Sequence, residues 1–173
     1  DDSNSLQTGR LESLVNTLAV TIPSVILPLI IAANAAFAFT FIEFKGREIY
    51  FAILVGLMII PLQSALIPVL RAMVSFQKAT GLQLTGNYPS AWIIHAAFAL
   101  PLAIYILRNY MMSIPVSLIE AARVDGASYY QIFWRLIMPM SVPALASFAI
   151  FQFLWVWNDY LIAFIFVGEQ TSV

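Results

Sequence analysis

Few side chains of this sequence have the chemistry of a reactive or ligand-binding site. His95 is the only histidine, and there are no cysteines. One histidine without a thiolate or a carboxylate cluster makes a poor metal site, so a hydrogen bond to a neighbouring helix is the alternative use of His95. No Ser-His-Asp arrangement or carboxylate pair can be assembled around it. The sequence therefore predicts no catalytic residues, no metal site and no cofactor bound by this chain.

Asp159 ends the group Trp155-Val156-Trp157-Asn158-Asp159, which lies in an otherwise apolar run. An ionisable group at membrane depth is costly and marks a candidate functional site. Trp155, Asn158 and Asp159 would suit a sugar, because indole rings offer apolar walls and Asn or Asp bonds hydroxyls. The same residues also fit a structural interpretation, in which Asp159 pairs with a polar neighbour or breaks the helix and the tryptophans anchor at the interface. Both interpretations stay open.

Asn34 and Gln63 are two further polar residues within apolar runs, and they complete the candidate substrate path. Each suits either a hydrogen bond between helices or a contact to a solute. Gly81 and Gly86 have the spacing of a phosphate-binding loop, but Asn87 and Tyr88 stand where that loop needs Lys and Ser or Thr. The glycines are therefore predicted to be turn residues, and the chain is not expected to hydrolyse nucleotides.

The composition predicts that these residues lie in a membrane. Hydrophobic residues make up 61% of the 173 residues and charged residues 10%, whereas soluble domains carry about 25% charged residues. Long stretches have no charge at all, and a spanning helix needs about 20 mostly apolar residues. We expect a single all-α, polytopic membrane domain over residues 1–173, with spans at about 14–41, 49–70, 90–107 and 140–167.

The distribution of basic residues predicts the orientation of these spans. One side collects five of the eight Lys and Arg residues (Lys45, Arg47, Arg108, Arg123 and Arg135), and the other side collects three (Arg10, Arg71 and Lys78). Cytoplasmic loops carry the excess of positive charge, so the loop at about 113–139 is expected in the cytoplasm. No basic patch suggests a nucleic-acid partner.

That loop has a local sequence typical of two short helices joined at a corner. Ser117 and Glu120 have the spacing of a capping box, and so do Ser128 and Gln131, which places a second helix start near Tyr129. Gly126 between them can take the left-handed conformation that closes the first helix. Pro139 is expected to mark the passage to the last apolar run.

The pattern E-A-A-x3-G-x9-L-x-M-P over residues 120–139 resembles the cytoplasmic EAA loop of permease subunits of binding-protein-dependent ABC importers. Leu136 and Met138 replace the isoleucine and leucine of the family pattern, both mild apolar changes. The local sequence is most similar to that of maltose-type carbohydrate permeases, at Arg123-Val124-Asp125-Gly126-Ala127 and, downstream, at Trp157-Asn158-Asp159. Such permeases usually have six spanning helices. The four expected here match the second to fifth, so the chain is interpreted as a fragment lacking the first and last.

The resemblance implies a transport subunit of a bacterial or archaeal cytoplasmic membrane, not an enzyme. In the family the EAA loop forms a coupling helix that docks on an ATPase subunit, and ATP and Mg²⁺ bind to that partner. The implied coupling residues are Glu120, Ala121, Ala122, Arg123, Asp125 and Gly126. Further implied partners are a sister or identical permease subunit, a periplasmic or extracellular solute-binding protein, membrane lipid and a sugar of the oligosaccharide or α-glucoside class. A permease for another small solute and a secondary transporter or channel subunit remain the alternatives.

Overall fold

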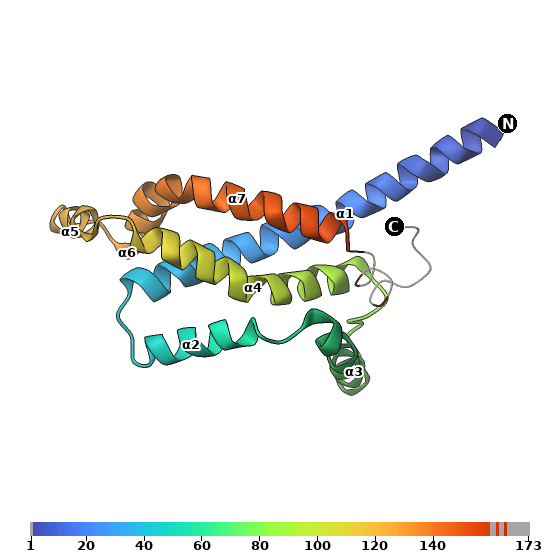
Figure 1. The fold of residues 1–173 in the computed structure, drawn as a ribbon, viewed down its shortest axis with the longest axis horizontal. Helices are drawn as coiled ribbons and strands as arrows, with labels where there is room; N and C mark the ends of the chain where they lie inside the picture. Colours follow the sequence, from blue (N-terminus) through green and yellow to red (C-terminus); the bar gives the residue numbers. More distant parts are fainter. Residues whose placement is uncertain (1, 160–161, 163–164, 166–173) are drawn as a thin grey trace. The chain divides into compact units, whose positions relative to one another are not determined.

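The computed structural model describes residues 2–159, 162 and 165, and within them the chain is helical without a strand. Figure 1 shows the elements in chain order. They are α1 (Asp2–Phe41), α2 (Arg47–Leu57), α3 (Leu62–Thr80), α4 (Tyr88–Met112), α5 (Val116–Val124), α6 (Tyr129–Ile132), a π-helical turn η1 (Phe133–Ile137) and α7 (Met138–Trp157). The expected all-α class is confirmed.

In the part of the chain that the structure describes, three helical stretches are long and apolar enough to cross a membrane: Leu11–Phe41, Tyr88–Met112 and Tyr129–Trp157. A fourth candidate is the pair α2 and α3, which meet at an angle of 105°. The expected second span at 49–70 therefore coincides with two helices instead of one. Pro61 accounts for the break, because it lacks an N–H and disfavours a helical conformation at the residue before it. It precedes α3 as its N-cap.

The expected last span at 140–167 begins inside α7, which ends at Trp157. Asp159 accepts a hydrogen bond from the backbone N–H of Ile162 at 3.1 Å, the pattern of a side chain that caps a new helical turn. This contact favours the interpretation in which Asp159 breaks the helix. Apart from Ile162 and Ile165, the part of the expected span beyond Asp159 lies outside the described residues.

The chain divides into two compact units. Unit 1 contains residues 1–27, 60–98 and 152–173, and unit 2 contains residues 28–59 and 99–151. The helices α1, α4 and α7 each contribute one segment to each unit.

Unit 1 is organised around two apolar clusters. Val20, Ala91 and Val156 join α1, α4 and α7. Leu66 of α3 packs with Ile94 and Ile162 in the other cluster. Small and branched side chains at these positions allow the helices to approach closely, which is how helices associate where lipid removes most of the hydrophobic driving force.

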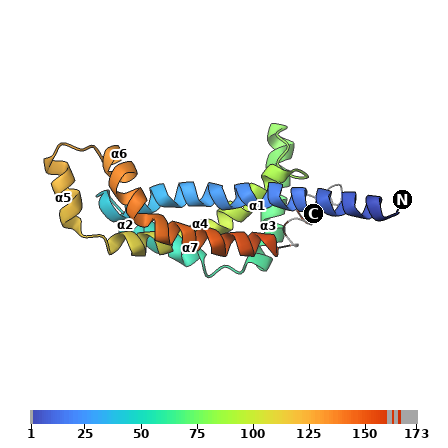
Figure 2. The same ribbon diagram turned by 90° about the horizontal axis from the view of Figure 1, so that it is seen from above.

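Unit 2 holds the loop that resembles the EAA loop. Its helices bury small residues, and Ala32, Ala36 and Ala103 are fully buried. In Figure 2, α5 is seen beyond the end of α4, and the chain returns through α6 into α7. The loop thus stands out from the helices that carry it while both of its ends stay attached to them.

Candidate functional site

The first helix of the loop, α5, begins at Val116 with Pro115 as its N-cap and has no side-chain cap. The capping box expected from Ser117 and Glu120 is therefore wrong. Pro115 has an extended ψ of 125°, so the chain enters the helix directly after it, and Ser117 already lies inside the first turn. A residue with helical backbone angles cannot take the extended conformation that an N-cap needs.

The corner between the helices is a Schellman motif centred on Gly126. The N–H of Ala127 donates to the carbonyl of Ala122, and the N–H of Gly126 donates to the carbonyl of Arg123, both at 2.9 Å. Gly126 has a φ of +82°, which confirms the predicted left-handed conformation. The two bonds satisfy carbonyls that the helix end would otherwise leave exposed. The exit direction of the chain from α5 is therefore set by backbone hydrogen bonds.

The second helix begins with the predicted capping box. The side chain of Ser128 accepts from the N–H of Gln131 at 3.3 Å, and the N–H of Ser128 donates to Gln131 Oε1 at 2.8 Å. Helix α6 starts at Tyr129, as expected. It passes through the wide turn η1 into α7. Pro139 lies in the first turn of α7 and leaves the carbonyl of Arg135 without its usual α-helical donor, which suits a wide turn at this point.

Replacing Ser128 with Ala is expected to destabilise the protein by about 1 kcal/mol, because it removes an N-cap acceptor. Ser117→Ala is the matched control, since Ser117 caps nothing and an exposed substitution changes stability by less than about 0.5 kcal/mol. Thermal unfolding of the two purified variants measures the difference. Equal stabilities would show that the Ser128 cap contributes nothing in the membrane protein.

The residues implied in coupling lie together on α5 and its corner. Ala122 is half-buried and the other five are exposed: Glu120, Ala121, Arg123, Asp125 and Gly126. Val124 beside them is 87% exposed, although it is apolar. Ile119, in the middle of the same helix, is buried. Helix α5 thus presents small, charged and apolar groups on an exposed surface.

A chain of aromatic contacts joins this corner to α1. The guanidinium of Arg123 donates to the hydroxyl of Tyr129 and lies 4.5 Å from the centre of its ring. Phe37 of α1 meets the ring of Tyr129 edge-on at 6.4 Å and that of Phe133 at 5.1 Å between centroids. Phe37 is 6% exposed. Sequence reasoning missed Phe37, whose one signal is an aromatic ring near the end of the first apolar run.

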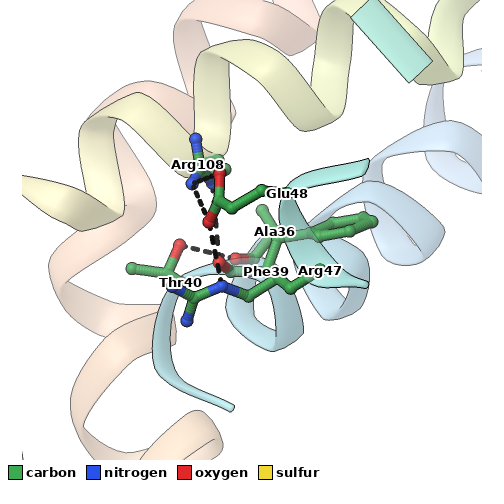
Figure 3. A network of polar contacts seen from close by, with 6 residues as sticks. All are labelled: Ala36, Phe39, Thr40, Arg47, Glu48 and Arg108. Carbon is green, nitrogen blue, oxygen red and sulfur yellow. Dashed lines mark hydrogen bonds and ion pairs between the residues drawn. The ribbon is translucent and has the colours of Figure 1, made fainter. Parts of the chain in front are cut away.

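Arg108 makes a second junction between α1, α2 and α4 (Figure 3). Its Nη2 lies 3.4 Å from both carboxylate oxygens of Glu48, and its Nε donates to the carbonyl of Phe39 at 3.5 Å. The guanidinium also lies 3.9 Å from the centre of the Phe51 ring. Its charge is thus shared among a carboxylate, a carbonyl and a π face. Arg108 thus connects the α1–α2 corner to the last turns of α4, shortly before α5 begins.

The residues predicted for a substrate path belong to both units. Asn34 is exposed in unit 2, where its side chain donates to the carbonyl of Ile30 at 2.8 Å within its own helix. Gln63 is exposed on α3 in unit 1. At the end of α7, Asn158 is exposed and donates to the carbonyl of Leu154 at 2.7 Å, while Trp155 is half-buried. Local helix bonds account for both amides, so a role of these residues in solute binding stays a prediction.

Among the described residues, no group of three His, Cys, Asp or Glu side chains could hold a metal ion. The exposed surface of α5 suits contact with another protein. Its corner is linked to α1 through the contacts of Arg123 with Tyr129 and of Tyr129 with Phe37.

Comparison with known proteins identifies similar chains. The family model described as "Binding-protein-dependent transport system inner membrane component" matches residues 10–172. An osmoprotective-compounds uptake permease protein, GgtD, of Synechocystis is 47% identical over 95% of this chain and 53% of its own length. The α-glucoside transport system permease protein AglG of Rhizobium meliloti is 49% identical over 90% and 41%. The arabinooligosaccharides permease AraQ of Halalkalibacterium halodurans is 32% identical over 84% and 50%.

The chain thus spans about half the length of the curated relatives it matches. The match of the family model includes α5, its corner and α7.

Proposed function

Because this chain belongs to the family of binding-protein-dependent transport system inner membrane components, we propose that its α5 surface couples it to an ATPase. On this proposal the protein is the permease subunit of an ABC importer for a sugar. It lies in the cytoplasmic membrane with residues 113–139 in the cytoplasm. The observation that carries the proposal is the Schellman corner at Gly126, which closes an exposed short helix with the EAA pattern.

The proposed mechanism is alternating access driven by a separate ATPase subunit, where ATP and Mg²⁺ bind. Inverting a two-state equilibrium from 1:99 to 99:1 takes about 5.5 kcal/mol of differential binding. Residues 120–126 have no nucleotide-binding chemistry, so that free energy has to come from the partner. Movement of α5 would reach α1 through the contact between Tyr129 and Phe37. It would reach α4, the helix that carries Arg108, through the short segment that connects α4 to α5.

Further partners follow from the same proposal. A solute-binding protein would deliver the solute from outside the membrane, and a sister or identical permease subunit would complete the path. Glu120, Arg123 and Asp125 are exposed charges on α5, and such charges at a rim contribute orientation more than affinity.

A sugar of the oligosaccharide or α-glucoside class is the proposed solute. Support comes from the names of two similar proteins, an α-glucoside permease and an arabinooligosaccharides permease. The name of a third, an osmoprotective-compounds uptake permease, favours a second candidate, namely a small osmoprotective solute. Uptake of labelled α-glucoside and of labelled osmoprotectant by proteoliposomes containing the complete transporter distinguishes them.

A crosslinking experiment tests the docking surface. Val124→Cys in the full-length protein is expected to crosslink to a co-purifying ATP-hydrolysing subunit, because Val124 is 87% exposed beside the corner. Ile150→Cys, also exposed at 63% but on α7, is the matched control and should give no such product.

Recovery of the crosslinked ATPase from Val124→Cys alone supports the proposal. Uptake driven by an ion gradient without ATP, with no ATPase crosslink from either position, would contradict it and favour a secondary transporter.

A further inference from the structure

In unit 1, hydrogen bonds and an apolar layer fix how the helices α1, α4 and α7 are aligned along their axes. The Tyr88 hydroxyl donates to Asn16 at 2.9 Å, and the Trp92 indole N–H donates to the carbonyl of Ala19 at 3.0 Å, so α4 runs parallel to α1 with an offset of 72 or 73 residues. Val20, Ala91 and Val156 form one apolar layer across α1, α4 and α7.

The next layer is polar on all three helices. A step of four residues along a helix is about one turn on the same face. Four residues after Val20 and Ala91 of the apolar layer are Ser24 on α1 and His95 on α4. Helix α7 runs in the opposite direction, so the matching position is four residues before Val156, which is Gln152. Gln152 Nε2 donates to the carbonyl of Ser24 at 3.5 Å, which confirms that these two positions share a level. Thr21 lies three residues before Ser24 on the same face of α1.

The bond from Gln152 has an identifiable cause in the sequence. The carbonyl of Ser24 would normally accept from the backbone N–H four residues later, but that residue is Pro28, which has no N–H. Prolines are tolerated in membrane helices where a neighbouring helix or a water satisfies the freed carbonyl. The side-chain amide of Gln152 on α7 supplies a donor for this freed carbonyl, at the long end of hydrogen-bond distances.

Four other side-chain atoms of this layer lack a hydrogen-bond partner among the described residues. Ser24 and Gln152 are 0% exposed, Thr21 is 1% and His95 is 2%. Within the described part of the chain, no hydrogen bond reaches Thr21 Oγ1, Ser24 Oγ, His95 Nε2 or Gln152 Oε1. An unpaired buried polar group costs about 1–3 kcal/mol in proteins, and four of them in one bundle call for another source of hydrogen bonds.

We propose that the polar layer of Ser24, His95 and Gln152, with Thr21 beside it, binds ordered water inside the membrane bundle. Water has two donors and two acceptors, which match the mixed set of two hydroxyls, one imidazole nitrogen and one amide oxygen. Buried waters typically make about three hydrogen bonds to such groups. A solute larger than water does not reach side chains that are at most 2% exposed. The site is therefore distinct from a solute path, and it holds whichever solute the protein transports.

Radiolytic labelling with ¹⁸O water tests the site in the complete, full-length transporter. Bound water places a source of hydroxyl radical next to the imidazole, so His95 is expected to incorporate ¹⁸O several-fold faster than Phe148, after correction for intrinsic reactivity. Phe148 is the control because it is equally buried, at 2% exposed, in an apolar setting. The variant Gln152→Leu should lower the labelling of His95 several-fold. Labelling of His95 no faster than that of Phe148 would overturn the proposal.

The sign of a stability change gives an independent readout. If the layer holds no water, the unpaired hydroxyl of Thr21 destabilises the folded protein, so Thr21→Val would raise the thermal unfolding temperature. In a hydrated layer the same change removes a partner of the water and lowers that temperature, which is the expected result. Thr17→Val is the matched control one turn away, since the Thr17 hydroxyl is already bonded to the carbonyl of Ser13 at 2.8 Å. A higher unfolding temperature for Thr21→Val than for Thr17→Val contradicts bound water.

Discussion

Replacing Gly126 with Val is expected to lower transport by roughly 5- to 30-fold while ATP hydrolysis continues. The left-handed conformation costs a residue with a Cβ about 1–2 kcal/mol, and β-branched residues are the least tolerant of it. That cost corresponds to a factor of about 5 to 30 in the population of the native corner. Space is not the obstacle, because no atom beyond the adjacent residues lies within 4 Å of the position that a Cβ would take. The effect should therefore come from the backbone and change the direction in which the chain leaves α5.

Two controls separate this cause from others. Gly126→Asn keeps a residue that tolerates the left-handed conformation, so it should retain most of the transport. Gly56→Val adds the same side chain at an exposed glycine of α2 that does not have a positive φ. Transport and ATP hydrolysis are measured together in proteoliposomes. Normal transport by Gly126→Val would remove the basis for a docking role of the corner.

Replacing Phe37 with Ala is expected to destabilise the protein by about 3–5 kcal/mol, the usual range for a buried Phe→Ala change. Phe37 is 6% exposed and contacts Phe133, Tyr129 and Phe41. Its edge-on ring contacts each add about 0.5–1.5 kcal/mol beyond burial. Because two of these rings belong to the returning arm of the loop, the loss should loosen that arm from α1.

Limited proteolysis at Arg123, together with thermal unfolding, measures this effect. Cleavage after Arg123 should be faster in Phe37→Ala than in Phe37→Leu, which keeps most of the apolar volume. Phe76→Ala serves as the surface control, since Phe76 is 52% exposed on α3. If Phe37→Ala unfolds and is cleaved like Phe76→Ala, then α1 does not hold the loop.

Sequence-based predictions succeeded where a structure depends on neighbours along the chain. The Ser128–Gln131 box and the left-handed Gly126 each rest on hydrogen bonds between residues at most five positions apart. Residue type and spacing specify such bonds before any tertiary contact forms. The Ser117 box has the same spacing and did not form, because Pro115 starts the helix earlier. Whether a pair with this spacing forms a capping box therefore depends on the backbone conformation of its first residue.

The division of the second apolar run shows a limit of hydropathy. Composition describes residues 49–70 as one continuous span. The structure shows two helices at 105°, because the chain around Pro61 leaves the helical conformation altogether. Whether a proline bends or breaks a helix depends on what the flanking segments pack against, which hydropathy does not record.

Length, charge-free runs and the E-A-A-x3-G pattern were enough to place this chain among membrane permeases and to locate its corner, since those signals are local or compositional. The junction of Phe37 with Tyr129 and Phe133 and the layer of Ser24, His95 and Gln152 became visible only in three dimensions. Their members are separated by some 60 to 130 positions and belong to apolar runs that look alike in sequence. Register between packed helices selects which of the few polar and aromatic residues in those runs meet, and that register is a property of the folded bundle.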